Sequence, residues 1–192
     1  MGGVPVQQLS FAPGALIPFG LLNTAPTRAD SLVSFWYSRE LTALNEPRLI
    51  DAATHEREVY RFLWLRSFDP PVAVRIQMAN DSAVAIVSET ANPAVFKPAR
   101  LTRRDTIRLT DAEWREFSDM LEREQFLAWT PTEPVPGGID GARWVFEGLR
   151  GGRYHIADRW APSDSGAGAS MRSAGLHFIR LGRVRVARDR IY

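Results

Sequence analysis

The chain has 192 residues, of which 45% are hydrophobic, with six Trp, ten Phe and no Cys, and its formal net charge is +2. This length supports one domain with a sizeable core, and the composition is that of a folded protein with an aromatic-rich interior. The missing cysteine excludes a disulfide framework, a thiolate nucleophile and Cys-ligated zinc, and the small net charge gives little long-range attraction to nucleic acid or to an anionic membrane.

Residues 1–29 are rich in Pro and Gly, nearly uncharged, and without a sustained helical or strand period. We therefore expect an extended or partly disordered N-terminal arm, followed by a single α+β domain over residues 30–192. The apolar stretch 11–22 is shorter than the roughly 20 residues needed to cross a bilayer, and prolines and glycines interrupt it. No membrane span is expected.

The segment 27–47 has the apolar spacing of a helix. Asn45 and Pro47 provide its end, because proline disfavours a helical residue before it. The side chains expected on its buried face are Val33, Trp36, Tyr37, Leu41 and Leu44. The aromatic triplet at 35–37 is interpreted as core packing rather than as a stacking platform for a ligand.

Four strands are expected after this helix, on the basis of β-branched and aromatic residues. Residues 57–67 are largely apolar on both faces, as in a central strand, whereas residues 72–78 alternate between apolar and polar side chains. A turn at 80–81 leads into the strand 83–89, which returns as an antiparallel partner. The fourth strand covers residues 103–109.

Two helices are predicted in the second half of the chain. The clearer one covers residues 109–126, where Thr110 and Glu113 have the spacing of a capping box. The other covers residues 171–182. The tail at 183–192 begins with alternating Arg and Val and is interpreted as an edge strand.

Between these helices, residues 142–150 and 153–160 are predicted to form a hairpin around Gly151 and Gly152, a pair that suits the positive φ values of a tight turn. A two-residue loop determines the register. It places opposite one another the pairs Arg150–Arg153, Leu149–Tyr154, Gly148–His155, Phe146–Ala157, Trp144–Arg159 and Arg143–Trp160, the last two as candidate cation–π contacts. The fold expected from all the elements is α+β, a single domain with a mainly antiparallel sheet of about five to seven strands and helices packed on at least one face.

The candidates for catalysis lie in the second strand of this hairpin, at His155, Asp158 and Arg159. Side chains on a strand alternate between its faces, so the odd separation puts His155 and Asp158 on opposite faces, whereas a general base must lie on the order of 3 Å from its partner. The preferred interpretation is structural: Asp158 pairs with Arg143, and the imidazole of His155 lies over the bare backbone of Gly148. An enzyme with a dispersed site around His155 and Arg159, which share a face, is the alternative.

No motif for metal or cofactor binding is present. The three histidines lack the spacing of a zinc site, and the chain has neither a phosphate-binding glycine loop nor a nucleophile elbow. We therefore expect no metal and no cofactor.

Charge is unevenly distributed along the chain. The helix at 111–124 carries six carboxylates against two arginines, whereas residues 97–108 and the C-terminal segment are basic. Neutralisation between neighbouring segments is the simpler interpretation, and a basic surface for nucleic acid is the less favoured alternative. The candidate binding residues are Trp144, Arg103, Arg104, Arg183 and Arg185.

The segments EVYRFLWLRSFDPPVAVRI, DGARWVFEG and GRYHIADRWAP resemble a group of bacterial hypothetical proteins with Trp-rich strand motifs. The resemblance covers most of residues 57–162. It implies a bacterial origin and a single compact domain. It implies no activity, so no catalytic residue carries over from it.

The function expected from these observations is a non-enzymatic protein-interaction domain, such as an envelope-associated binding protein or an immunity- or inhibitor-like protein. The expected partner is a protein. The expected location is the bacterial cytoplasm, or the periplasm or envelope if a signal segment was removed from the chain.

Overall fold

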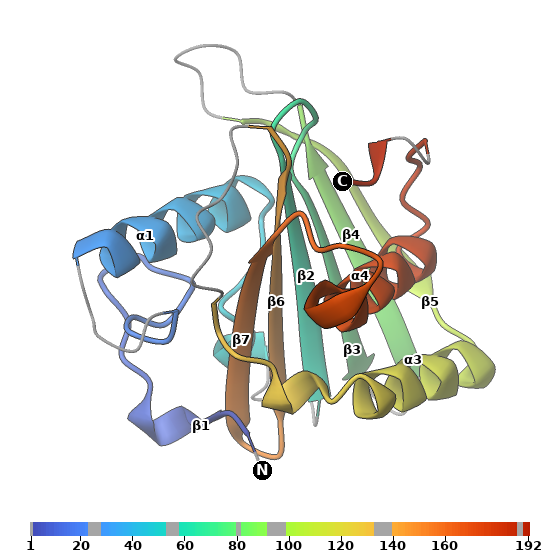
Figure 1. The fold of residues 1–192 in the computed structure, drawn as a ribbon, viewed down its shortest axis with the longest axis horizontal. Coiled ribbons are helices and arrows are strands. Elements are labelled where there is room, and N and C mark those ends of the chain that lie inside the picture. The colour runs from blue at the N-terminus through green and yellow to red at the C-terminus, as the bar shows by residue number, and fades with distance from the viewer. Residues whose placement is uncertain are drawn as a thin grey trace.

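The structure, a computed structural model, describes residues 2–22, 28–52, 58–79, 82–91, 99–132, 140–187 and 190–192. Its centre is a seven-stranded sheet (Figure 1) in the order β1-β7-β6-β2-β3-β4-β5, with every neighbouring pair antiparallel. The strands are β1 (Val4–Pro5), β2 (Glu58–Arg66), β3 (Val72–Ala79), β4 (Ser82–Thr90), β5 (Leu101–Arg108), β6 (Ala142–Arg150) and β7 (Arg153–Trp160).

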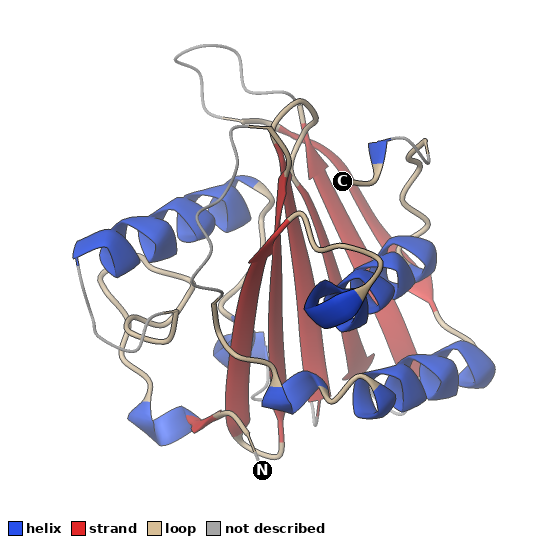
Figure 2. Ribbon diagram, in the orientation of Figure 1, coloured by secondary structure: helices blue, strands red, loops and turns tan. Residues whose placement is uncertain are grey.

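Helices cover both faces of this sheet (Figure 2), which confirms the predicted α+β class. They are α1 (Arg28–Ala43), α2 (Leu49–Ala52), α3 (Asp111–Arg123) and α4 (Ala169–Leu181), with short 3-10 turns η1 (Val6–Gln8), η2 (Phe126–Ala128) and η3 (Gly166–Gly168). None of the helices in the described ranges is long and apolar enough to cross a membrane.

Each face of the sheet has its own apolar core. On one face, stacked aromatic rings of β2 and β6 pack against α3 and α4, and Phe62 and Phe146 lie 4.8 Å apart between ring centroids. On the other face, Tyr37 and Leu41 of α1 pack against Leu63 and Val145. Both faces of β2 are therefore buried, as its two apolar faces predict.

The predicted capping box of α3 is confirmed. The Thr110 Oγ1 accepts a hydrogen bond from the Glu113 N–H, and the Glu113 carboxylate accepts one from the Thr110 N–H. The end of α1 is confirmed too, because Asn45 adopts a left-handed φ of 54° directly before the connection to α2.

The β6–β7 hairpin has the predicted register throughout. Gly151 and Gly152 adopt φ values of 56° and 71°, as the two-residue turn requires. Of the two expected cation–π contacts, one is confirmed, since the Arg143 guanidinium lies 5.5 Å from the Trp160 ring centroid.

The space above Gly148 is filled differently from the prediction. A Cβ atom added at Gly148 would lie 2.4 Å from Phe126 Cε1, so the Phe126 ring lies over this bare backbone. The His155 ring instead packs edge to face against the Phe126 ring, with 5.3 Å between the ring centroids. The expectation that the imidazole fills this space is therefore wrong, because η2 carries a phenylalanine into it.

The predicted edge strand at 183–192 is also wrong for the residues that the structure describes there, 183–187 and 190–192, which form no strand. The apolar side chains of this tail cover the core beside α4, and both sheet edges belong to other strands. The predicted turn at 80–81 and most of the proline-containing loops at 90–99 and 130–138 lie outside the described residues.

Residues 2–22 pack along one side of the sheet. Val4 and Pro5 pair with Tyr154 and Arg153 as the edge strand β1. Ile17 and the loop around it are held against α1, where the Ile17 N–H donates to Ser38 Oγ.

Candidate functional site

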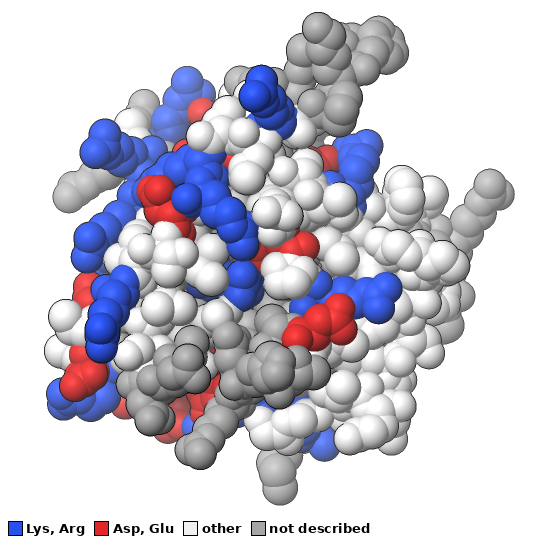
Figure 3. Space-filling model, turned by 180° about the vertical axis from the view of Figure 1, so that it is seen from behind, with Lys and Arg blue, Asp and Glu red and all other residues white. Residues whose placement is uncertain are grey.

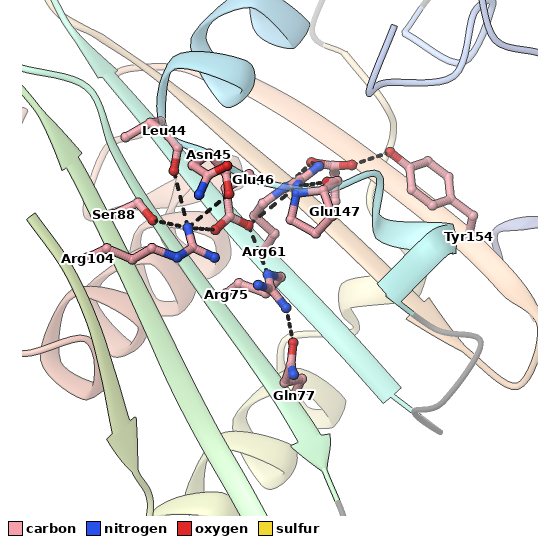
Figure 4. Close-up of polar contacts among 11 residues, drawn as sticks. Leu44, Asn45, Glu46, Arg61, Arg75, Gln77, Ser88, Arg104, Glu147 and Tyr154 are labelled. Carbon is pink, nitrogen blue, oxygen red and sulfur yellow. Dashed lines mark hydrogen bonds and ion pairs between the residues drawn. The ribbon is translucent and has the colours of Figure 1, made fainter. Parts of the chain in front are cut away.

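The most polar region of the interior is a network of ion pairs on the α1 side of the sheet (Figure 4). Arg61 lies opposite Glu147 across β2 and β6, and its Nε donates to Glu147 Oε2 at 2.7 Å. The Tyr154 hydroxyl donates to the other carboxylate oxygen, also at 2.7 Å. Arg61 is fully buried, so its charge needs these partners to offset the cost of desolvation.

Glu46 is the second carboxylate of this network and forms ion pairs with arginines of three strands. Arg75 Nε lies 2.9 Å from Glu46 Oε2, and Arg61 Nη1 lies 3.6 Å from the same oxygen. Arg104 Nη1 lies 3.4 Å from Glu46 Oε1 and also donates to the Asn45 carbonyl at 2.9 Å. We call Glu46, Arg61, Arg75, Arg104 and Glu147 the arginine clamp.

The arginine clamp fixes the connection between α1 and α2 to strands β2, β3, β5 and β6. Its carboxylates accept hydrogen bonds from several donors, and Gln77 and Ser88 supply further oxygen acceptors to its arginines. Each charged group therefore has its partner inside the protein. This arrangement is structural, because each buried charge is neutralised by an oppositely charged side chain of the same cluster.

A second polar cluster holds α1 to the hairpin. The Tyr37 hydroxyl donates to Asp158 Oδ2 at 2.7 Å, and Arg143 Nη1 lies 3.1 Å from the same oxygen, which confirms the predicted Asp158–Arg143 pair. Burial raises the pKa of Asp158, although Arg143 and Tyr37 act against that shift. Burial and the neighbouring carboxylate raise the pKa of Tyr37, which therefore stays protonated.

His155 and Asp158 lie on opposite faces, as the alternation of strand side chains predicts. Arg159 shares the face of His155, but its guanidinium donates to the carbonyl and hydroxyl of Thr130 at 2.9 and 2.7 Å. The His155 Nε2 is buried and has no hydrogen-bond partner among the described residues. Burial and the charge of Arg159 lower the pKa of His155 to about 4, so the imidazole is neutral at pH 7.

His155 lines a cavity of about 420 Å³ at the β7 edge of the sheet. Its wall comes from four segments: residues 2–4 at the start of the N-terminal arm, residues 20–21 further along the arm, the stretch 127–131 after α3, and β7. The lining residues are Gly2, Gly3, Val4, Gly20, Leu21, Leu127, Ala128, Trp129, Thr130, Pro131, Tyr154, His155 and Ile156. The wall is apolar and uncharged at neutral pH, and a cavity of this size suits a small ligand or a few residues of a peptide. We call it the edge cavity.

The remaining candidate residues do not form a common site. Trp144 is fully buried, with its indole N–H donating to the Tyr192 carbonyl at 2.9 Å. Arg103 forms ion pairs with Glu89 and Asp105, both at 2.6 Å. Arg104 belongs to the arginine clamp. Arg183 and Arg185 are exposed. Basic and acidic side chains lie close together on much of the face opposite α3 and α4 (Figure 3), in agreement with internal neutralisation.

Sequence reasoning missed the arginine clamp and the edge cavity. A signal for the first was present, because Arg61 and Glu147 each stand inside a strand that is otherwise largely apolar. No group of three or more His, Asp and Glu residues within the described ranges is placed to hold a metal ion. Neither protein-family models nor curated protein sequences match the chain, so its function must be inferred from this geometry.

The substitution Glu46→Gln is expected to lower the free energy of unfolding by about 3–5 kcal/mol, because it leaves buried arginines without their charge partner. The matched control is Glu122→Gln, whose carboxylate is 65% exposed beside Arg150. For that exposed pair we expect a loss of at most about 1 kcal/mol. Urea denaturation of both variants measures the difference. An equal loss in the free energy of unfolding for the two variants would show that the arginine clamp contributes no more to stability than an exposed ion pair.

The free energy of unfolding is expected to fall by about 2 kcal/mol between pH 7 and pH 5 on account of His155. The unfolded histidine takes up its proton near pH 6.5, whereas the folded one does so only near pH 4, so stability is lost as the pH falls through this window. The variant His155→Leu should lack this part of the pH dependence in urea denaturation. Identical pH profiles for the two proteins would show that His155 is readily protonated in the folded state.

Proposed function

We propose that the chain is a non-enzymatic protein-interaction domain and that the edge cavity holds part of its partner. The observation that carries this proposal is the edge cavity itself, an apolar hollow of about 420 Å³ lined in part by His155, whose buried Nε2 has no hydrogen-bond partner among the described residues. Concave and mainly apolar cavities of this size with a few polar groups are the usual form of binding sites.

The arrangement of the ionisable groups supports binding over catalysis. The described residues that line the edge cavity include no carboxylate and no second histidine. His155 itself is a weak base at neutral pH, because burial and Arg159 lower its pKa to about 4. Asp158, the other candidate for acid–base chemistry, is bound to Tyr37 and Arg143 on the opposite face.

The test is affinity capture from a lysate of the source organism after nuclease treatment, with the wild-type chain and two variants. Leu21→Trp fills the edge cavity, whereas Leu176→Trp adds the same ring on α4, at a site that is 38% exposed. We expect one stoichiometric protein partner with the wild type and with Leu176→Trp, and a loss of about tenfold or more with Leu21→Trp, which is about 1.4 kcal/mol of binding energy.

Three results would contradict the proposal. They are the absence of any specific partner, capture that is seen in an untreated lysate but lost after nuclease treatment, and equal capture by all three proteins. The urea denaturation curve of Leu21→Trp serves as the control that the variant remains folded.

A further inference from the structure

The outer edge of β7 has a defined hydrogen-bonding direction. The Asp158 N–H donates to the Pro131 carbonyl at 2.7 Å, and the Gly152 carbonyl accepts from the Val6 N–H at 3.0 Å, both on the side away from β6. Backbone groups alternate in direction along an antiparallel strand, and β7 is regular from Arg153 to Trp160. The N–H and C=O of Ile156 therefore also point away from β6.

Described residues pair with this edge on both sides of Ile156, but none of them pairs with Ile156 itself. Val4 lies opposite Tyr154, so a longer β1 would place Gly2 opposite Ile156. The chain instead turns at Gly3, which adopts a φ of 79°, and Gly2 lies against the Leu127 carbonyl. The structure records no hydrogen bond from a described residue to the outer backbone groups of Ile156.

The gap at Ile156 coincides with the edge cavity. Val4 and Pro131, which bound the gap on either side, line the same cavity as Ile156 and His155. More than about nine in ten buried backbone groups are paired in native structures, so an N–H and a C=O of Ile156 without a partner among the described residues are unusual. Together they form a site for a group that carries both a donor and an acceptor.

We propose that this gap in the edge of β7 accepts a short extended main-chain segment of the partner, whose N–H and C=O pair with those of Ile156. The inference rests on the proposed function and specifies the chemistry of the segment. The wall is uncharged and apolar, which favours an uncharged segment with an apolar side chain. The gap between Tyr154 and Asp158 spans about 13 Å, which leaves room for one or two residues.

The test is an NMR titration of the ¹⁵N-labelled full chain with N-acetyl-leucine N′-methylamide, a single apolar residue between two peptide groups. The matched control is the same compound with both amide nitrogens methylated, which keeps the carbonyls and the side chain but removes both N–H donors. We expect saturable binding in the millimolar range, shifts at the Ile156 amide and His155, and binding weaker by about tenfold for the methylated compound.

Two outcomes would overturn the inference. If both compounds bind equally and shift His155 but not the Ile156 amide, the edge cavity is a binding site without main-chain pairing, and the proposed function survives. If neither compound binds saturably, main-chain recognition is excluded, whereas the capture experiment with Leu21→Trp still decides the proposed function separately.

Discussion

A fully buried arginine in the middle of the sheet is the constraint on which the α1 side of the molecule depends. Arg61 is desolvated on all sides, and its charge is tolerable only with partners that are equally buried. Glu147 meets it from the neighbouring strand, and Glu46 meets it from the connection after α1. The end of α1 is therefore fixed by electrostatics, while Tyr37 and Asp158 attach the middle of the helix to β7.

The pairing of these buried charges also bears on where we propose the binding site. The arginine clamp and the Asp158 cluster pair their own buried charges within the protein, and the opposite face of the sheet is filled by aromatic rings. At the β7 edge, where the turn at Gly3 separates the chain from Ile156, the outer backbone groups of Ile156 have no partner among the described residues. This is the part of the fold at which we propose that a partner binds.

Much of the fold could be predicted because its signals are local. The alternation of β7, the Gly151–Gly152 turn and the α3 capping box each depend on a few neighbouring residues. The alternation and the turn predicted the hairpin register and the Asp158–Arg143 pair. The arginine clamp depends on β2 lying between β6 and β3, an order that periodicity does not determine. The edge cavity depends on four segments that are separate in sequence, and on the turn at Gly3 directly before the two-residue strand β1.

Amide hydrogen exchange of the isolated full chain, measured by NMR, tests whether the N–H of Ile156 lacks a partner at the edge of β7. The Asp158 N–H is bonded to the Pro131 carbonyl, and Tyr154 is paired with β1, whereas no described residue pairs with Ile156. We expect slow exchange at the Asp158 and Tyr154 amides and much faster exchange at the Ile156 amide between them. Protection of the Ile156 amide equal to that of Asp158 would show that the chain itself pairs with this residue, and that no gap is open to a partner.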